Sequence, residues 1–351
     1  MAHIWLRAEQ RDNETRVGLT PDGAKSLLDR GMSVTVEHSD TRVIATQDYA
    51  DAGCEIADFA SWPNAPLDAI VFGLKELPED GTPLRHRHIL FGHAFKGQAS
   101  GRVLLERFKA GGGSLYDLES LTDENGRRVA AFGYWAGYAG AAVSLMAWIA
   151  QQSGGVCDEV SAYANKDALL ADLSARLTKL GTSRPTAIVI GAKGQVGTGA
   201  TDLLAGLGST VREWDMAETA HGGPFDEILE HDIFVNSILA RDGTPVFVPE
   251  AAKSAPRRLS VIGDVACDPD SAFNPIPLYD RATSWAAPVL RVHDTPPLDI
   301  MAIDNLPSLL PLESSQDYAE QLLPTLQSLT DLDGSVWTRA LAEFHKHSAA
   351  L

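Results

Sequence analysis

The stretch TAIVIGAKGQVGTGATDLLAGLGSTVREWD, residues 186–215, decides the fold of this chain. It begins with the apolar run 187–190, turns through Gly191, Gly194 and Gly197, and continues as a predicted helix over 199–207. A second short strand, 210–214, ends at an acidic residue. A strand, a glycine turn, a helix, a strand and an acid in this order predict a βαβ unit that binds a dinucleotide.

Each part of this unit has a physical role beside a dinucleotide. Small residues at Gly194 and Gly197 let the backbone approach a pyrophosphate, and the new helix offers free N–H groups and a positive dipole end. Asp215 can bond both ribose hydroxyls and would repel a 2′-phosphate, which favours NAD over NADP. Ala192 stands where the usual pattern has its first glycine, which is displaced to Gly191. The alternative is a βαβ unit whose glycines only make tight turns.

Length, charge and cysteine content limit the class of protein. A chain of 351 residues is long for one core, so we expect two domains. The net charge of -18 argues against nucleic-acid and acidic-membrane partners, which need basic surface. Three scattered cysteines without metal-ligand spacing predict reduced thiols, no metal site and a cytoplasmic protein. The N-terminus lacks a signal-peptide pattern.

One segment, residues 129–151, carries no charged side chain and is long enough to span a bilayer. Its Gly133 and Gly137 have the spacing that lets helices pack closely. Its tyrosines, tryptophans and glycines make it less apolar than a typical membrane span. We therefore expect a buried helix between two domains, with a membrane anchor as the alternative.

Short apolar runs separated by helices indicate parallel sheets covered on both faces. The predicted strands are 33–37, 69–74, 88–92, 114–118, 233–238 and 259–264, and the final helices are 316–329, which Pro324 can kink, and 335–349. We expect an α/β fold of two Rossmann-like domains with a cleft between them. Residues 1–128 plus 315–351 would form the substrate and catalytic domain, and residues 129–314 the NAD-binding domain.

Titratable residues follow three successive predicted strands. Lys75 and Glu76 follow 69–74, His93 follows 88–92, and Glu119 follows 114–118. In parallel sheets these strand ends share one edge, where ligands bind.

Such a set suits oxidation of an amino acid at a C–N bond. A desolvated lysine can take a proton from nitrogen, a histidine can assist hydrolysis of the imine, and glutamates tune both. Arginines can hold substrate carboxylates. Taken singly, Lys75-Glu76 could be an ordinary exposed pair, His93 a core histidine, and Arg127-Arg128 a helix cap.

With these residues in view, the chain resembles the family of NAD-dependent, lysine-forming saccharopine dehydrogenases, which is similar in turn to alanine dehydrogenase and transhydrogenase. The resemblance covers nearly the whole chain. It rests on collinear motifs: Leu6-Arg7-Ala8-Glu9, Arg16-Val17-Gly18-Leu19-Thr20-Pro21, Gly73-Leu74-Lys75-Glu76, His93-Ala94-Phe95-Lys96, Leu115-Tyr116-Asp117-Leu118-Glu119, Gly126-Arg127-Arg128-Val129-Ala130-Ala131-Phe132-Gly133, Gly222-Gly223-Pro224-Phe225-Asp226-Glu227, and Ile303 to Pro311.

The resemblance implies a role for each matched position. Lys75 would be the base and His93 the acid–base catalyst, with Glu76 and Glu119 tuning them. Substrate would be bound by Arg16, Gln98 and Arg128. Cofactor contacts would come from Arg127, Phe132, Gly194, Gln195, Asp215, Thr219, Val265, Ile303, Asp304 and Leu306. Leu239 stands where fungal members have an aromatic residue.

We therefore expect an oxidoreductase that converts saccharopine and NAD to L-lysine, 2-oxoglutarate and NADH, or the reverse. Its partners would be these small molecules, with no nucleic acid and no membrane, and the chain would be a monomer. An alanine-dehydrogenase-like or opine-type enzyme, and an NAD-binding protein without catalysis, are the alternatives.

Overall fold

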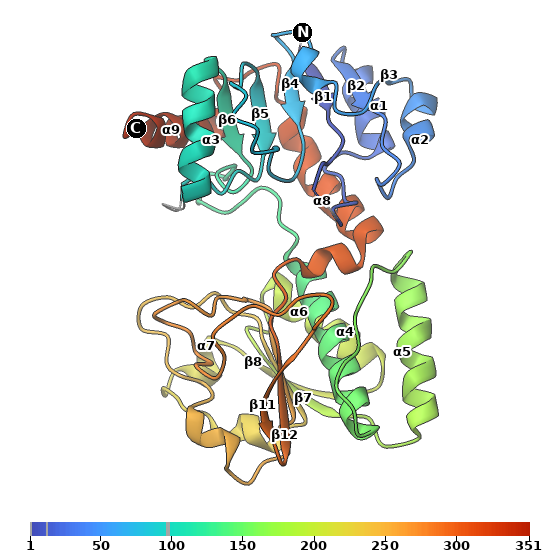
Figure 1. Ribbon diagram of the computed structural model, residues 1–351, viewed down its shortest axis with the longest axis vertical. Helices are drawn as coiled ribbons and strands as arrows, with labels where there is room; N and C mark the ends of the chain where they lie inside the picture. Colours follow the sequence, from blue (N-terminus) through green and yellow to red (C-terminus); the bar gives the residue numbers. More distant parts are fainter. Residues whose placement is uncertain (1, 12, 96–98) are drawn as a thin grey trace. The chain divides into compact units, whose positions relative to one another are not determined.

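The computed structural model describes residues 2–11, 13–95 and 99–351. The chain divides into two compact units, residues 1–131 with 311–351 and residues 132–310. The boundaries expected from the sequence, after residues 128 and 314, lie a few residues away from these. Both units are α/β, as predicted, and each is built on a six-stranded sheet (Figure 1).

The sheet of the first unit is wholly parallel and has the strand order β3-β2-β1-β4-β5-β6. The strand order reverses between β1 and β4, which pair with Leu6 opposite Phe72. The strands are β1 (His3–Leu6), β2 (Ser33–Glu37), β3 (Glu55–Ala57), β4 (Ile70–Phe72), β5 (Arg87–Leu90) and β6 (Ser114–Asp117). The helices are α1 (Pro21–Asp29), α2 (Thr46–Asp51), α3 (Ala99–Gly111), α8 (Pro311–Leu326) and α9 (Ser335–Ser348), with a 3₁₀ turn η1 (Trp62–Asn64).

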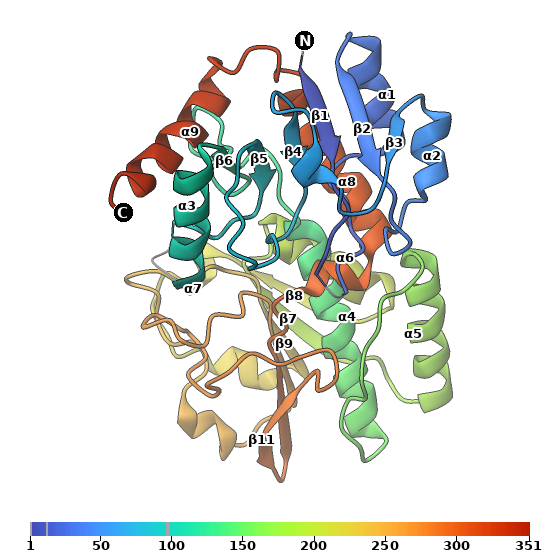
Figure 2. The same cartoon turned by 45° about the horizontal axis from the view of Figure 1, so that its top comes forward.

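The C-terminal helices return to this first sheet, as Figure 2 also shows. Trp337 of α9 is fully buried and meets Tyr116 of β6 edge to face, with ring centroids 5.4 Å apart. Phe344 of α9 packs in the same way against Phe108 of α3. Pro324 lies inside α8, and this helix ends two residues later, at Leu326.

Two polar side chains in the N-terminal part of this unit, those of Thr20 and Glu37, form hydrogen bonds to groups of the same unit. The side chain of Thr20 caps α1 by accepting the N–H of Gly23 at 3.2 Å. Glu37, at the end of β2, is fully buried. Its carboxylate accepts the N–H of Ala8 at 2.8 Å, the N–H of Trp62 at 2.5 Å and the indole N–H of Trp5 at 3.0 Å.

The sheet of the second unit has the order β11-β12-β10-β9-β7-β8. Its strands are β7 (Thr186–Ile190), β8 (Thr210–Trp214), β9 (Ile233–Asn236), β10 (Val261–Asp264), β11 (Leu290–Asp294) and β12 (Pro297–Met301). The helices are α4 (Gly133–Gln152), α5 (Lys166–Leu180), α6 (Gln195–Gly206) and α7 (Met216–Thr219), with 3₁₀ turns η2 (Asp226–Glu230), η3 (Glu250–Lys253) and η4 (Leu306–Leu309). The expectation of a parallel sheet fails at β11, which is antiparallel to β12.

Alternate side chains of β7 enter two different cores, because successive strand residues point to opposite faces. Ala187 and Val189 pack with α4, α5 and α6, whereas Ile188 and Ile190 pack with Trp214 and the segments around η2 and η3. Both faces of the sheet are therefore covered, which explains why its central strands are continuously apolar.

The uncharged segment of the sequence forms the buried helix α4, whose residues 137–149 are shielded from solvent. A Cβ at Gly137 would lie 1.7 Å from the carbonyl oxygen of Val196 in α6. A Cβ at Gly199 would lie 2.0 Å from the carbonyl oxygen of Tyr134 in α4. The glycines thus let two helices of one unit touch backbone to backbone. In the described part of the chain, no helix combines the length and hydropathy that a membrane span requires.

Candidate active site and cofactor site

Lys75 leaves the first sheet where the strand order reverses. It follows β4, whose neighbour β1 marks this reversal. Ligands of open α/β sheets bind beyond the carboxyl ends of the strands at such a point. The topology alone therefore makes Lys75 a candidate for contact with a ligand.

The surroundings of Lys75 favour an uncharged amine. Burial lowers the pKa of Lys75, the positive charges of Arg16 and Arg11 lower it further, and Glu14 and Glu76 oppose them. Within the described ranges, the ammonium forms no hydrogen bond or ion pair. A lysine with a lowered pKa and no fixed partner can accept a proton from a substrate nitrogen.

Arg16 forms a buried bidentate pair with Glu14. Its Nε and Nη2 donate to the two carboxylate oxygens at 2.9 and 2.6 Å, and both residues are at most 3% exposed. Burial alone would raise the pKa of Glu14, but the hydrogen bonds and charge of Arg16 outweigh it and the pKa is lowered. The resemblance implies a substrate carboxylate as the partner of Arg16. Glu14 was not predicted as a site residue, because a glutamate two residues before an arginine does not by itself indicate that the two side chains pair.

His93 lies between two carboxylates. Its Nδ1 is 3.7 Å from Glu119 Oε1 and its Nε2 is 4.0 Å from Glu76 Oε1. Its ring stacks on Phe91 with centroids 6.2 Å apart. The side chain is 34% exposed, so the interpretation as a core histidine is wrong. A backbone φ of 48° is uncommon for histidine, and such conformations concentrate at functional sites.

Asp117 supports this cluster from the end of β6. It is 1% exposed, and its Oδ1 accepts the N–H of Glu119 at 2.9 Å. Burial raises the pKa of Asp117. Asp117 is not among the residues predicted from the sequence, although a carboxylate inside the predicted strand 114–118 is a signal.

Arg127 and Arg128 are presented by a tight hairpin. Thr122 bridges to Arg128, and the carboxylate of Asp123 accepts the N–H groups of Asn125 and Arg127 at 2.8 and 2.9 Å. Both arginines are exposed, and neither guanidinium makes an ion pair with any residue that the structure describes. They are therefore available to carboxylates. Gln98, also predicted to bind substrate, lies outside the described residues.

The glycine turn of the second unit leaves space for a ligand. Gly191 has a φ of 88°, a conformation that would be strained for a residue with a side chain. A Cβ at Gly197 would lie 2.1 Å from the carbonyl oxygen of Gly191. By contrast, a Cβ at Gly194 would meet nothing closer than 3.4 Å, and its φ of −79° suits any residue. Neither backbone nor packing requires glycine at 194. The open space over it, at the N-terminus of α6, fits a pyrophosphate.

Asp215 lies beside this turn. Its Oδ2 accepts the N–H of Lys193 at 3.0 Å, and its Oδ1 accepts the N–H of Met216 at 2.8 Å. Thr219 donates to the carbonyl oxygen of Asp215 at 3.0 Å. These bonds hold the carboxylate where the ribose of a nucleotide on the glycine turn would lie.

A pocket opens at the same edge of the second sheet. Its lining includes Gly191, Asp215, Met216, Thr219, Leu239 and Arg241. Met216 and Leu239 are each 78% exposed, which is unusual for large apolar side chains. The apolar side chains of Met216 and Leu239 beside the carboxylate of Asp215 suit a purine ring attached to a ribose.

The other residues predicted to contact the cofactor occupy different environments in this unit. Phe132 and Gln195 lie at the N-termini of α4 and α6. Val265 contacts the position that a Cβ at Gly140 would take. Ile303 and Leu306 are at most 3% exposed and pack in the core, whereas Asp304 is exposed. Only the backbone of Ile303 and Leu306 can therefore face a ligand.

Comparison with known proteins gives consistent results. Residues 5–139 match the family model "Alanine dehydrogenase/PNT, N-terminal domain". Two proteins named saccharopine dehydrogenase [NAD(+), L-lysine-forming] are similar over nearly their whole length. The one from Yarrowia lipolytica is 45% identical, covering 98% of this chain and 97% of the relative. The one from Schizosaccharomyces pombe is 43% identical, covering 96% of each.

Solved structures share the fold. An L-alanine dehydrogenase superposes with a TM-score of 0.70 at 19% identity, covering 97% of this chain and 94% of that one. A transhydrogenase from Sinorhizobium meliloti gives 0.64 at 16% identity, covering 96% and 97%. The full-length similarity to the fungal proteins is decisive, and the chain belongs to the family of NAD-dependent, L-lysine-forming saccharopine dehydrogenases.

Proposed function

We propose that this protein oxidises saccharopine with NAD and water to L-lysine, 2-oxoglutarate, NADH and a proton, and that it also catalyses the reverse. The observation that carries the proposal is the half-buried Lys75, whose pKa is lowered and which lies where the strand order of the first sheet reverses. The same chain holds a glycine turn with open space over Gly194. The names of the fungal relatives supply the substrate.

The first step is oxidation of the secondary amine. Lys75, as the neutral amine, takes the proton from the substrate nitrogen, and the C–N bond becomes an imine. NAD, when bound, accepts the hydride from the adjacent carbon. The lowering of the pKa of Lys75 matters because the base must be uncharged before each turnover.

The second step is hydrolysis of the imine. His93 takes a proton from water as its oxygen adds to the imine carbon, giving a carbinolamine. His93 then gives its proton to the leaving nitrogen and takes the proton of the carbinolamine hydroxyl as the C–N bond breaks, so that this oxygen becomes the ketone of 2-oxoglutarate. Glu76 and Glu119 lie within 4.0 Å of the ring nitrogens and can hold the ring in position.

Substrate carboxylates are held by arginines. Arg128 is exposed on its hairpin and is suited to a bidentate contact. Arg127 lies beside it and is assigned to the cofactor. Arg16 is already engaged by Glu14, so we assign it to electrostatic tuning of Lys75 as well as to substrate orientation.

The second unit holds the cofactor. Gly194 would take the pyrophosphate, Asp215 would bond the ribose, and Met216 and Leu239 would contact the purine. Backbone groups near Val265 and residues 303–306 complete the site. We further propose that the protein acts as a monomer in the cytoplasm.

A spectrophotometric substrate panel tests the function. NADH formation is followed with saccharopine, alanine and opines, each with NAD and NADP. We expect turnover with saccharopine and NAD. Turnover with alanine alone would assign the chain to a different activity, and binding of NAD without any oxidation would make it a non-catalytic protein.

Variants test the two catalytic assignments. Lys75→Met and His93→Gln should each lower turnover about 10²–10⁴-fold, the usual contribution of a general acid or base. An unchanged rate would remove that residue from the mechanism.

A further inference from the structure

The motif Leu6-Arg7-Ala8-Glu9 has no role in the mechanism above, yet its charged side chains are almost completely buried. The side chain of Arg7 is 0% exposed and that of Glu9 is 8% exposed, and they form an ion pair at 3.2 Å. β1 continues into this motif beside β4, since the N–H of Arg7 donates to the carbonyl oxygen of Phe72 at 2.9 Å. The pair therefore lies where the backbone leaves β4 toward Lys75.

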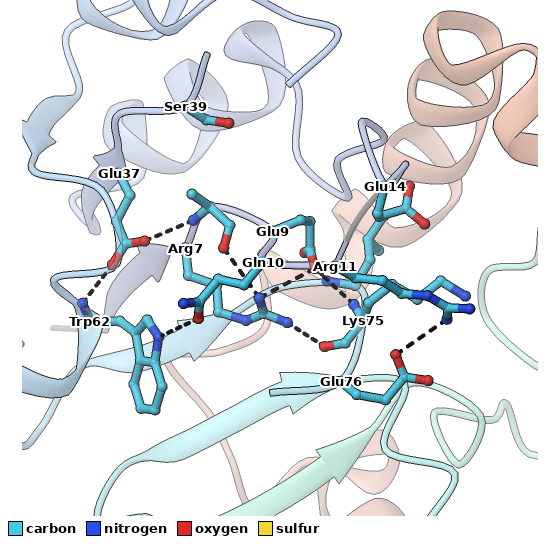
Figure 3. Close-up of polar contacts among 12 residues, drawn as sticks. Arg7, Glu9, Gln10, Arg11, Glu14, Glu37, Ser39, Trp62, Lys75 and Glu76 are labelled. Carbon is cyan, nitrogen blue, oxygen red and sulfur yellow. Dashed lines mark hydrogen bonds and ion pairs between the residues drawn. The ribbon is translucent and has the colours of Figure 1, made fainter. Parts of the chain in front are cut away.

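The pair holds the backbone of the proposed base (Figure 3). One carboxylate oxygen of Glu9 accepts the N–H of Leu74 at 2.6 Å and the other accepts the N–H of Lys75 at 3.1 Å. Nη2 of Arg7 donates to the carbonyl oxygen of Lys75. The N–H and the carbonyl of Lys75 are thus both bound by one ion pair.

Gly73 belongs to the same arrangement. A Cβ at this position would lie 2.4 Å from Nε and 2.6 Å from Cζ of Arg7. Only glycine lets the guanidinium lie against the backbone here. The motifs Leu6-Arg7-Ala8-Glu9 and Gly73-Leu74-Lys75-Glu76 therefore form one structural unit.

We propose that Arg7 and Glu9 are positioning residues for Lys75, a role that rests on the proposed function of Lys75 as the base. The ammonium of Lys75 has no partner among the described residues and ends a flexible four-carbon stem. Its reach to a substrate nitrogen is therefore set by its backbone. A fixed backbone lowers the number of positions that the amine samples and keeps it within proton-transfer distance.

Glu9→Gln is the primary variant. An amide has one acceptor oxygen, so it cannot accept both N–H groups, and its NH₂ would face one of them. We expect kcat/KM for saccharopine to fall about 10²-fold, the loss that a small misplacement of a reacting group produces. The pH at which kcat/KM is half-maximal should not move, since Glu9 is not among the charges that shift the pKa of Lys75. The affinity for NAD should also be unchanged.

A double-mutant cycle separates this inference from the proposed function. If Lys75 is the base and Glu9 acts through it, Glu9→Gln will cost nothing further in Lys75→Met. If Lys75→Met keeps full activity, the proposed function fails. If Lys75→Met is impaired and Glu9→Gln lowers its residual rate by another 10²-fold, the positioning role is refuted.

Controls address folding. Asp299→Asn removes another fully buried carboxylate, paired with Arg291 in the second unit, and should leave the activity of folded protein unchanged. If Glu9→Gln does not fold, Arg7→Lys takes its place in the cycle. It keeps the charge but has one nitrogen in place of the two, Nη1 and Nη2, with which Arg7 contacts Glu9 and Lys75. Full activity of Arg7→Lys, or an equal loss in Asp299→Asn, would overturn the proposal.

Discussion

Replacing Gly137 by alanine should force α4 and α6 apart. The new Cβ would lie 1.7 Å from the carbonyl oxygen and 2.6 Å from the carbonyl carbon of Val196. Ordinary contacts begin at 3.4 Å, so the helices must separate by 3.4 − 1.7 = 1.7 Å. Both clashing atoms belong to the backbone and cannot rotate away. Overpacking in a core costs about 1–3 kcal/mol, and we expect about 3 kcal/mol here.

This cost should appear in thermal unfolding and in cofactor binding. For a unit of this size, 1 kcal/mol corresponds to about 2–4 °C in Tm, so Tm should fall by about 6–12 °C. Val196 is the second residue of α6, whose N-terminus faces the proposed pyrophosphate site. Its displacement should weaken NAD binding about tenfold, equivalent to about 1.4 kcal/mol.

The assay is a thermal melt with and without NAD, together with titration of NAD by fluorescence quenching. Gly206→Ala is the matched control, because Gly206 also lies in a helix of this unit and a Cβ there meets no atom within 4 Å. It should stabilise the protein by about 0.4–1 kcal/mol. A Gly137→Ala protein that melts at or above the wild-type temperature would refute the reasoning.

Two other predictions concern pH and cofactor choice. Because activity requires neutral Lys75, kcat/KM rises with pH through the pKa of Lys75. Glu76 raises that pKa and Arg11 lowers it, so Glu76→Gln should move the rise to lower pH and Arg11→Gln to higher pH. Shifts in the same direction would contradict this electrostatic account. Asp215→Ala should lower kcat/KM with NAD about 10- to 100-fold, as expected when hydrogen bonds worth about 1.5–3 kcal/mol are lost, and should increase use of NADP because Arg241 lines the same pocket. Unchanged discrimination would remove Asp215 from ribose recognition.

The fold was predictable where apolar runs are long or bounded by glycine. Residues 186–215 and the uncharged segment before them gave the core of the second unit, because β7 is buried on both faces and α4 is apolar all round. The strands β1, β3, β11 and β12 were not predicted. β11 is only partly buried and carries Arg291, His293 and Asp294, so its pattern has neither alternation nor a continuous apolar run.

The site was predictable as far as chain position determines it. Residues that directly follow parallel strands share one edge, and on this ground Lys75, His93 and Glu119 could be grouped. The Glu14–Arg16 pair and the contact of Glu9 with the backbone of Lys75 depend on loop conformation, which spacing does not encode. The same holds for the positive φ of His93, since most histidines, like other non-glycine residues, have a negative φ.

The buried carboxylate of Glu37 and the threonine cap of α1 bear on which of the two units can bind a nucleotide. Glu37 ends the strand next to β1, as Asp215 follows the strand next to β7, and Thr20 precedes the first helix as Gly194 precedes α6. Both acids accept backbone N–H groups, but Glu37 is fully buried whereas Asp215 is only partly buried, and α1 has a side-chain cap that α6 lacks. A nucleotide could therefore reach the acid and the helix end in the second unit, whereas the buried carboxylate and the threonine cap exclude one from the corresponding positions in the first.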